Sequence, residues 1–399
     1  MAHCGNAAMP WARARDTARE LGARRTTVAA HVPLSAALGA TLGAELTALV
    51  GVPSYDASAM DGYAVAGPGP WRVRGRILAG SAASVAELRP GEAVEIATGA
   101  RVPAGTVSVL PYEHARVEDG RVSGHIEPGR HVRRSGEDTS AGSSVLPAGT
   151  AVTPAVLGLA ASLGHDTLAV RRPRIAAFVT GDELAHSGRP GLGQVRDAIG
   201  PMLPGLAAWS GAAVEAVHHL GDGYRAVLDT LRSAIDRPAT DVIVVCGASS
   251  QGPADHLRAA LSDLGATVAV DGVACRPGHP QLLAHSGSAQ APETVVVGLP
   301  GNPNAALVSA MTLLVPVLGA MAGRVDSAAV LPRTLPVLGD VRPHHRDTRL
   351  VAVRVAKERA EPVGYDRPGI LRGAAMADAY AVIPPDWSGP DAELVWLPR

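Results

Sequence analysis

Residues 173–184 read PRIAAFVTGDEL, and this stretch decides the fold. Its apolar run, Ile175–Val179, predicts a buried strand, and the polar turn Thr180–Glu183 ends that strand. Comparable apolar runs follow at 213–218, 241–246 and 294–297. The helices expected after the strands cover 201–209, 223–235, 253–264 and 304–320. Strands that alternate with helices indicate βαβ units, so we expect a parallel sheet within residues 171–325.

The loops that follow these strands are candidate binding segments because ligands of parallel sheets bind beyond the carboxyl ends of the strands. They are Thr180–Glu183, Gly221–Gly223, Cys246–Gly252 and Leu299–Pro303. The third loop runs Gly247-Ala248-Ser249-Ser250-Gln251-Gly252 before a helix, where backbone N–H groups can hold a phosphate. Packing of small residues is the alternative interpretation of this loop.

Four acidic residues also fall on this expected edge: Asp182, Glu183, Asp222 and Asp255. Together they suit Mg²⁺, which prefers oxygen ligands, although each alone fits a helix cap or a turn equally well. The run Arg276-Pro277-Gly278-His279-Pro280, just before the fourth strand, offers a cation for an oxyanion or else a rigid turn. The pairs His218-His219 and His344-His345 lack partners at metal-binding spacing, so we interpret them as structural or surface residues.

The rest of the chain predicts smaller β-rich parts. Short alternating runs indicate strands at 71–78, 93–97, 107–112 and 120–126, and in the tail at 350–355, 379–383 and 393–397. Residues 13–50 predict one or two helices, and 155–163 a short one. We expect four domains. They are a split linker domain (13–50 and 141–170), a β-rich domain (51–140), a central α/β domain (171–325) and a C-terminal β domain (326–399).

Composition narrows the function classes. The 399 residues include 45 Gly and 32 Pro, yet 47% are hydrophobic, which favours a multi-domain globular protein over a disordered chain. A net charge of -1 and 3% aromatic residues argue against nucleic-acid binding. The three cysteines (Cys4, Cys246, Cys275) have neither zinc nor disulfide-framework spacing.

No signal peptide or membrane span is expected, so the cytoplasm is the expected compartment. The N-terminus lacks a long apolar core, and the apolar run around Met311–Met321 contains Pro316 and is interpreted as too short to span a membrane. The chain has one lysine, Lys357, against 35 arginines, a ratio that we attribute to nucleotide bias.

The sequence resembles the molybdopterin molybdenumtransferase family, which includes bacterial MoeA and the E domain of gephyrin. The segments that carry the resemblance are SYDASAMDGYAV (54–65), EIATGARVPAG (95–105), RRSGEDTSAGSSVLPAGT (133–150), PRIAAFVTGDEL (173–184), RPGHP (276–280) and LPGNP (299–303). The resemblance implies a multi-domain α/β fold: a central doubly wound parallel domain of the molybdopterin-binding type, an elongated linker domain, a small β domain and a C-terminal β-barrel-like domain.

The resemblance also implies an activity. Such enzymes take molybdate and adenylylated molybdopterin, insert molybdenum into the dithiolene and release AMP with the help of Mg²⁺. It implies a homodimer whose active sites lie between the central domain of one subunit and the β domains of the other. The resemblance also implies two further partners, the adenylyltransferase that supplies the substrate and the apo-molybdoenzymes that receive the cofactor. It implies binding to neither nucleic acid nor membrane.

Site residues are carried over by motif. The implied catalytic residues are Asp61, Thr98, Asp138, Glu183 and Asp255. The implied substrate-binding residues are Asp182, Gly247, Ser250, Gly252, Arg276, His279, Pro300, Gly301, Asn302 and Pro303. The implied metal ligands are Asp222 and Asp255. From the residues alone, the runs that contain Asp61, Thr98 and Asp138 fit a turn as well as a site.

The chain departs from the family pattern at five places. Where the family has GGVSVG, this chain has Gly247–Gly252, with Ala248 and Gln251 among the changes. Where the family has the two lysines of KPGKP, this chain has Arg276 and His279. Where the family has DSN, this chain has Asp197-Ala198-Ile199. The family's Asp-Asp pair is Asp222-Gly223, and its C-terminal serine pair is Arg372-Gly373. The alternative function is therefore a catalytically degenerate paralogue that binds a pterin nucleotide as a carrier or scaffold.

Overall fold

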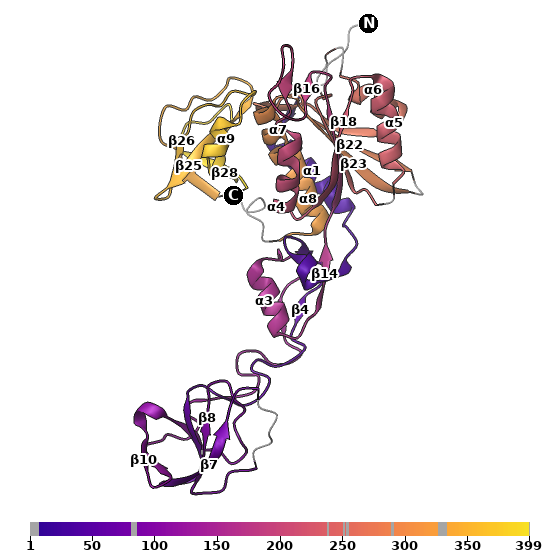
Figure 1. Cartoon of the computed structure of the whole chain (residues 1–399). Helices are drawn as coiled ribbons and strands as arrows, with labels where there is room; N and C mark the ends of the chain where they lie inside the picture. The colour runs from indigo at the N-terminus through magenta and orange to yellow at the C-terminus, as the bar shows by residue number, and fades with distance from the viewer. Residues whose placement is uncertain are drawn as a thin grey trace. The chain divides into compact units, whose positions relative to one another are not determined.

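The computed structural model describes residues 8–80, 86–237, 239–249, 252, 255–288, 291–325 and 333–398 (Figure 1). The chain forms two compact units. Unit 1 comprises Met1–Ala44, Ala148–Pro154 and Thr167–Arg399, and unit 2 comprises Glu45–Pro147 and Ala155–Asp166. The two units therefore divide the predicted linker segments between them, and the four-domain division stays a prediction.

A six-stranded sheet forms the centre of unit 1. Its order is β18 (Ala213–Leu220), β15 (Arg174–Thr180), β19 (Val242–Cys246), β23 (Ala291–Leu299), β22 (Leu282–Ser288) and β20 (Thr267–Asp271). The first four strands are parallel, as the sequence predicts, and the last two pairings are antiparallel. The antiparallel strands were not predicted, and β22 separates the RPGHP run from the fourth parallel strand, which corrects the position expected for that run.

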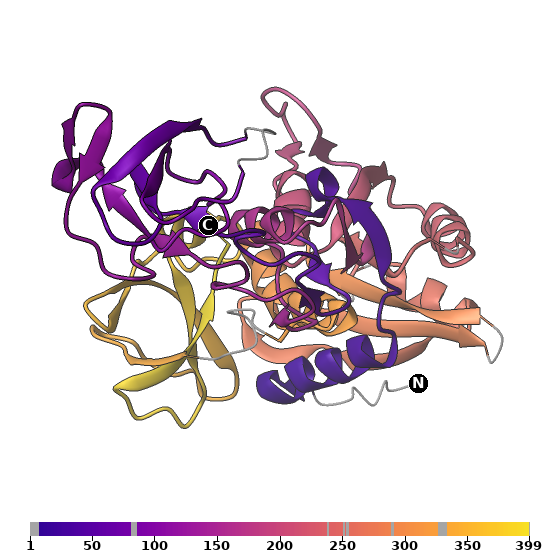
Figure 2. The same ribbon diagram turned by 90° about the horizontal axis from the view of Figure 1, so that it is seen from below.

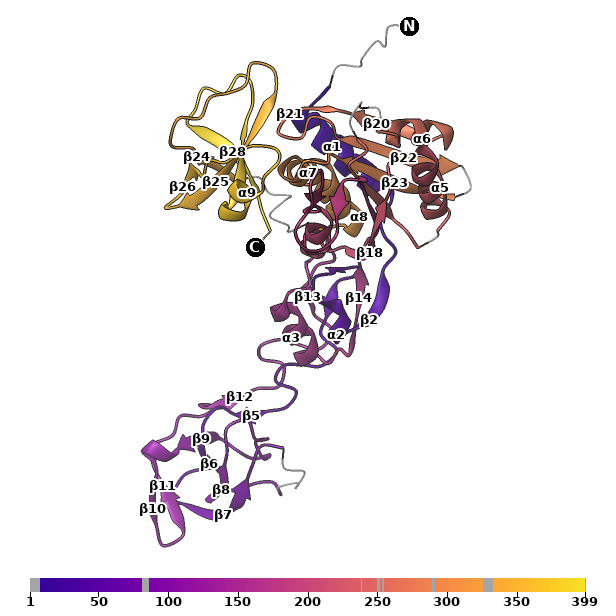
Figure 3. The ribbon, with the colours of Figure 1, turned by 45° about the horizontal axis from the view of Figure 1, so that its top comes forward.

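Both faces of this sheet are covered by helices. On β19, Val242 and Val244 belong to one buried cluster and Ile243 and Val245 to another, because successive side chains of a strand point to opposite faces. The helices α5 and α6 lie on one face, whereas α1, α4, α7 and α8 lie on the other (Figure 3). Their bounds are α1 Trp11–Arg24, α4 Leu203–Trp209, α5 Tyr224–Ile235, α6 Leu257–Asp263, α7 Pro303–Ser309 and α8 Val315–Ala322.

The helix that follows β23 is the most apolar element. A π-helical turn, η3 (Ala310–Leu314), joins α7 to α8, and the continuous helix Pro303–Ala322 has 20 residues. The expectation that this run is too short for a membrane span was therefore wrong in length. Its most apolar window is 83% buried within the protein, and α1 packs along it (Figure 2), so it is a core helix of unit 1.

A seven-stranded sheet contains the C-terminal residues. Its order is β1 (Met9–Pro10), β21 (Val273–Arg276), β25 (Thr348–Ala356), β27 (Ala379–Ile383), β28 (Asp391–Trp396) and β24 (Arg333–Pro336), with β26 (Arg359–Pro362) paired to β25. The helix α9 (Arg372–Met376) accompanies it. The three predicted tail strands are present, but β1 and β21 come from distant parts of the chain, so local periodicity could not reveal this joint sheet.

Smaller elements complete unit 1. The strands β2 (Ala30–Pro33), β14 (Thr167–Arg171) and β3 (Thr41–Leu42) form one small sheet, and β16 (Leu184–Ala185) pairs with β17 (Val195–Arg196). Two short helices are α2 (Leu34–Ala37) and η2 (Gly200–Met202). The prediction of one or two helices over 13–50 holds for α1 and for α2, but residues 38–50 are not helical. Gly39 turns the chain with φ = +78°, and a Cβ on Gly43 would lie 2.5 Å from the Ala29 Cβ.

Unit 2 is a β structure around a six-stranded sheet, as expected for residues 51–140. The order is β10 (Arg116–Glu118), β11 (Arg121–Ser123), β7 (Trp71–Ile77), β8 (Glu92–Ile96), β6 (Gly62–Val65) and β9 (Ser108–Pro111). Two small pairs are β5 (Ala57–Ser58) with β12 (Val132–Arg133) and β4 (Leu46–Thr47) with β13 (Ser144–Leu146). The helices are η1 (Tyr112–His114) and α3 (Pro154–Ser162).

Candidate functional site

The carboxyl ends of three central strands are joined directly to one another. The Thr180 hydroxyl at the end of β15 donates a hydrogen bond to the Cys246 carbonyl oxygen at the end of β19 (3.2 Å). The Gly247 N–H donates to the Leu299 carbonyl oxygen at the end of β23 (3.0 Å). The predicted loops therefore lie along one edge of the sheet, which we call the carboxyl edge.

Asp182 and Asp222 connect the loop after β18 to this edge. The Asp182 N–H donates to Asp222 Oδ2 (3.3 Å), and the Asp222 N–H donates to Asp182 Oδ1 (3.4 Å). Each carboxylate thus supports the other loop through a long hydrogen bond, and the Asp182 side chain is exposed. Both roles predicted from the sequence, turn former and metal ligand, are compatible with this pair, because the two aspartates stabilise turns and also bring their carboxylates together. Glu183 beside them is exposed, and its carbonyl accepts the Val195 N–H.

The third loop begins with a glycine whose conformation is required. Gly247 has φ = +105°, and a Cβ there would lie 2.7 Å from the Thr180 carbonyl oxygen. At the far end of the loop, Asp255 Oδ2 accepts the Gly252 N–H (2.7 Å). Ser250 and Gln251 lie outside the described residues, so a phosphate cradle in this loop stays a prediction.

The RPGHP turn packs against the third loop. The Ser249 hydroxyl donates to the Pro280 carbonyl oxygen (2.6 Å), and a Cβ on Gly278, which has φ = +101°, would lie 2.8 Å from Ser309 Oγ on α7. His279 is exposed beside this loop. The turn therefore reaches the carboxyl edge despite the strand that intervenes in sequence.

Arg276, the first residue of that run and the last of β21, has a partner just before β25. Its Nε donates to Asp347 Oδ2 (2.7 Å), and His344 Nδ1 lies 3.4 Å from the same carboxylate oxygen. Partial burial and the neighbouring Arg276 lower the pKa of His344, which accepts the Asp347 N–H. His344 therefore has a structural role, one of the two roles expected for the pair His344-His345.

The fourth loop, Pro300–Pro303, leads directly from β23 into α7. Gly301 and Asn302 are exposed, and a Cβ on Gly301 would lie 3.6 Å from Gly247 Cα. The Asn302 carbonyl accepts the Ala306 N–H, so this residue begins the helix. The loop thus lies beside the third loop on the carboxyl edge.

In unit 2, the predicted residues fall into two groups. Asp61 Oδ1 accepts the Thr98 N–H (2.7 Å), and both residues are exposed. Asp138 forms an ion pair with Arg133 instead. The structure therefore brings Asp61 and Thr98 together, and their exposure is compatible with a site as well as with a turn.

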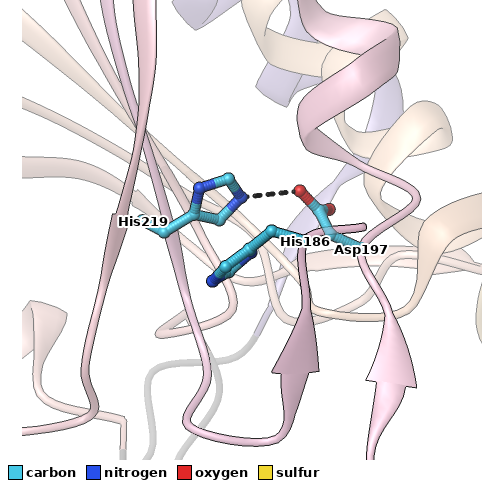
Figure 4. Close-up of side chains that lie close together, drawn as sticks. All are labelled: His186, Asp197 and His219. Carbon is cyan, nitrogen blue, oxygen red and sulfur yellow. Dashed lines mark hydrogen bonds and ion pairs between the residues drawn. The ribbon is translucent and has the colours of Figure 1, made fainter. Parts of the chain in front are cut away.

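One cluster was missed by the sequence analysis. His186, Asp197 and His219 each offer one potential ligand atom, and these atoms lie within 4.8 Å of one another (Figure 4). His219 therefore has partners at metal-binding distance, which its spacing in the sequence did not show. The residues are far apart in sequence, and only the packing of β16, β17 and β18 joins them. The one local signal was Asp197 before a glycine-containing turn.

The two described cysteines are unsuited to nucleophilic chemistry. Cys246 and Cys275 are fully buried free thiols, and burial raises the pKa of both, for Cys275 to about 12. The described thiols are therefore packing residues, consistent with their spacing. Cys4 lies outside the described residues.

The donor set on the carboxyl edge fits Mg²⁺. Asp182 and Asp222 supply carboxylate oxygens, which Mg²⁺ prefers, and their mutual hydrogen bonds are long enough to be exchanged for metal ligation. Among the described residues, however, Asp255 does not join them in a group of three ligands close enough for one ion. A metal site with Asp222 and Asp255 as direct ligands therefore remains a proposal.

Comparison with known proteins gives matches over most of the chain. Residues 9–164 match the family described as the MoeA N-terminal region (domain I and II), and residues 176–320 match the probable molybdopterin binding domain. Molybdopterin molybdenumtransferase 2 of Mycobacterium tuberculosis (strain H37Rv) is 38% identical over 317 residues, which cover 74% of this chain and 76% of that protein. Molybdopterin molybdenumtransferase of Bacillus subtilis (strain 168) is 30% identical over 382 residues, 88% of this chain and 85% of that protein.

A solved structure shares the fold. The molybdopterin biosynthesis moeA protein of Pyrococcus horikoshii OT3 has a TM-score of 0.76 at 20% identity, covering 98% of this chain and all of that one. The expected multi-domain α/β architecture, with a central parallel domain and β-rich domains, is thereby confirmed.

Proposed function

This chain belongs to the molybdopterin molybdenumtransferase family, and from that premise we propose that it inserts molybdenum from molybdate into adenylylated molybdopterin and releases AMP. The observation that carries the proposal is the carboxyl edge of the central sheet, where four loops with family motifs meet. The alternative, a degenerate binder of a pterin nucleotide, is not favoured, because the relatives that match most of this chain are named as transferases.

The edge has chemistry that suits a phosphoanhydride substrate. The segment from Gly247 to Gly252 precedes α6 in the chain, and we propose that its backbone N–H groups hold a phosphate of the substrate. We assign Asp182 and Asp222 to holding Mg²⁺, which when bound would neutralise the charge of the phosphate groups. Asp255 fixes the loop at Gly252 and adds a negative charge beside it.

Positioning is the role of the neighbouring turns. The exposed Gly301 and Asn302 and the exposed His279 adjoin the third loop, where they would orient molybdate and the pterin. Cleavage of the anhydride by water breaks the bond between the adenylyl phosphorus and the bridging oxygen, so AMP leaves and the pterin keeps its own phosphate. Two Mo–S bonds form as the dithiolene sulfurs replace one oxo ligand of molybdate, and that oxygen leaves as water with the two dithiol protons, so molybdenum keeps its oxidation state.

Unit 2 is assigned a second part of the site. Asp61, Thr98 and Asp138 are exposed carriers of the family motifs. We propose a homodimer in which the β domains of one subunit complete the site on the central domain of the other. We further propose that the protein works in the cytoplasm, where it receives substrate from an adenylyltransferase and passes cofactor to apo-molybdoenzymes.

Reconstitution separates the two functions. Purified protein, adenylylated molybdopterin, molybdate and Mg²⁺ are incubated together, and AMP and molybdenum cofactor are measured. The transferase produces both in equal amounts. Tight binding of the pterin nucleotide with AMP no higher than in a protein-free control would reject the enzyme and establish the binder.

A further inference from the structure

The cluster of His186, Asp197 and His219 lies next to the proposed site but has no part in it. His219 is the penultimate residue of β18, His186 follows β16, and Asp197 follows β17 (Figure 4). His219 Nε2 is 2.9 Å from Asp197 Oδ2, and the potential ligand atoms of all three side chains lie within 4.8 Å of one another. This cluster offers two imidazoles and one carboxylate, whereas the pair Asp182–Asp222 offers carboxylates alone.

Asp197 is held in a fixed orientation. Its side chain is only 4% exposed, and its Oδ1 accepts the N–H groups of Ile199 (2.9 Å) and Gly200 (3.0 Å). A Cβ on Gly200 would lie 2.4 Å from Asp197 Oδ2, so glycine is needed to leave room for the carboxylate. One oxygen is thus anchored to the backbone and the other is directed at His219, as in metal sites whose ligands are oriented by a surrounding hydrogen-bond network.

The two imidazoles complete the group from the exposed side. The ring centroids of His186 and His219 are 3.7 Å apart with an angle of 41° between the planes. Both residues are exposed, so their rings have room to turn while the buried carboxylate stays in place. Figure 4 shows the His219 ring facing the Asp197 carboxylate and the His186 ring beside that of His219.

We propose that His186, Asp197 and His219 bind Zn²⁺. Two imidazole nitrogens and one carboxylate oxygen are a donor set that zinc accepts, whereas Mg²⁺ prefers oxygen alone. Zinc ligands at about 2.0–2.2 Å from the metal are roughly 3.3 Å from one another. The 2.9 Å pair is already close to that value, and a ring rotation of His186 brings in the third ligand.

Zinc at this site would connect the segment 186–197 to the edge strand β18. The segment begins just after Asp182 and Glu183, so the ion would fix a loop that borders the carboxyl edge. Three protein ligands leave a fourth position to water. The proposal is independent of the transferase activity, because it rests on this cluster alone.

Zinc titration of the untagged full-length protein tests the proposal. His3 and Cys4 can bind Zn²⁺ in any conformation, so all variants carry H3A and C4S. The apoprotein is titrated with Zn²⁺ alone by calorimetry and with a chromophoric competitor. We expect one Zn²⁺ per chain, at least about tenfold weaker affinity in H186A, H219A and D197N, and a zinc-dependent rise of the unfolding temperature that these variants lack.

His218 provides the matched control. It is the neighbour of His219 on β18, but its ring stacks on Phe178 (centroids 5.7 Å apart), so H218A should bind Zn²⁺ like the parent. H186A tests the site without disturbing buried residues, since His186 is exposed. A Kd for Zn²⁺ weaker than about 10 μM in the parent would overturn the proposal. So would the same Kd for Zn²⁺ in H186A, H219A and the parent.

Discussion

Two acidic groups near the end of β18 differ in how they are held. Asp222, three residues after His219, exchanges long hydrogen bonds of 3.3 and 3.4 Å with the exposed Asp182. Asp197 is buried, accepts two backbone N–H groups and contacts His219 at 2.9 Å. The first pair is accessible to a charged substrate, whereas the second has its partners within the protein.

Burial changes what a carboxylate contributes to stability. A buried charge is costly unless it is hydrogen-bonded, so Asp197 must be fully paired and contributes to stability. An exposed pair in water contributes little to stability and can exchange its partners for a ligand. We therefore expect substitutions on the carboxyl edge to change activity and substitutions at Asp197 to change the fold.

The largest effect is expected for D255N. Asparagine keeps an acceptor oxygen for the Gly252 N–H but removes a carboxylate charge that would attract Mg²⁺ to the substrate phosphates. AMP formation should fall at least about 100-fold, a loss of about 2.7 kcal/mol of transition-state stabilisation, with an unchanged unfolding curve. The control is D229N on α5, whose side chain is 71% exposed and pairs with Arg232. A D255N rate equal to that of D229N would remove Asp255 from the catalytic residues.

The next effect concerns stability. D197A leaves the N–H groups of Ile199 and Gly200 without their side-chain acceptor and should lower the free energy of unfolding by about 1–3 kcal/mol. D182A, which removes an exposed carboxylate, should change it by less than about 0.5 kcal/mol. Urea unfolding of both variants measures the contrast. Equal destabilisation would show that burial does not distinguish the two groups.

A smaller effect is expected in the pH dependence of the stability difference between wild type and D197A. Burial raises the pKa of Asp197, but hydrogen bonds from His219, Gly200 and Ile199 outweigh it, so the pKa lies below the ordinary value of 3.8. A lowered pKa gives stability that is complete above the pKa of the unfolded chain and is lost as the pH falls through that of the folded protein. The difference between wild type and D197A should thus shrink from pH 7 to about pH 3. A difference that stays constant over this range would contradict the assignment.

The smallest effect is expected for H279K. His279 is exposed next to the third loop, where a lysine would add a fixed positive charge for an oxyanion. The concentration of molybdate that gives half-maximal AMP formation should fall about threefold to tenfold. An unchanged molybdate dependence would show that position 279 does not contact the anion.

The sequence predicted the central domain well for a physical reason. Parallel strands are buried on both faces, so runs such as Ile175–Val179 and Asp241–Cys246 were visible as apolar stretches between turn residues. Their connectivity then placed the four loops on one edge. The helical prediction for residues 13–50 failed beyond Ala37, because the alanines and leucines that follow favour a helix while Gly39, with its positive φ, turns the chain.

Long-range pairings were beyond the sequence analysis. The joint sheet of β1, β21 and β25 and the cluster of His186, Asp197 and His219 depend on contacts between residues with no local periodicity. Motifs named Asp61, Thr98 and Asp182 as site residues, but the hydrogen bonds that join Asp61 to Thr98 and Asp182 to Asp222 came only from the structure.

The most direct test of the proposed active site is the Mg²⁺ dependence of AMP formation in D222N. Asparagine still accepts the Asp182 N–H, so the loop is retained while the ligand charge is lost. We predict that D222N needs at least about tenfold more Mg²⁺ for half-maximal AMP formation than wild type or D229N. The same Mg²⁺ dependence in all three proteins would contradict the assignment of the carboxylate pair Asp182–Asp222 as the metal-binding part of the site.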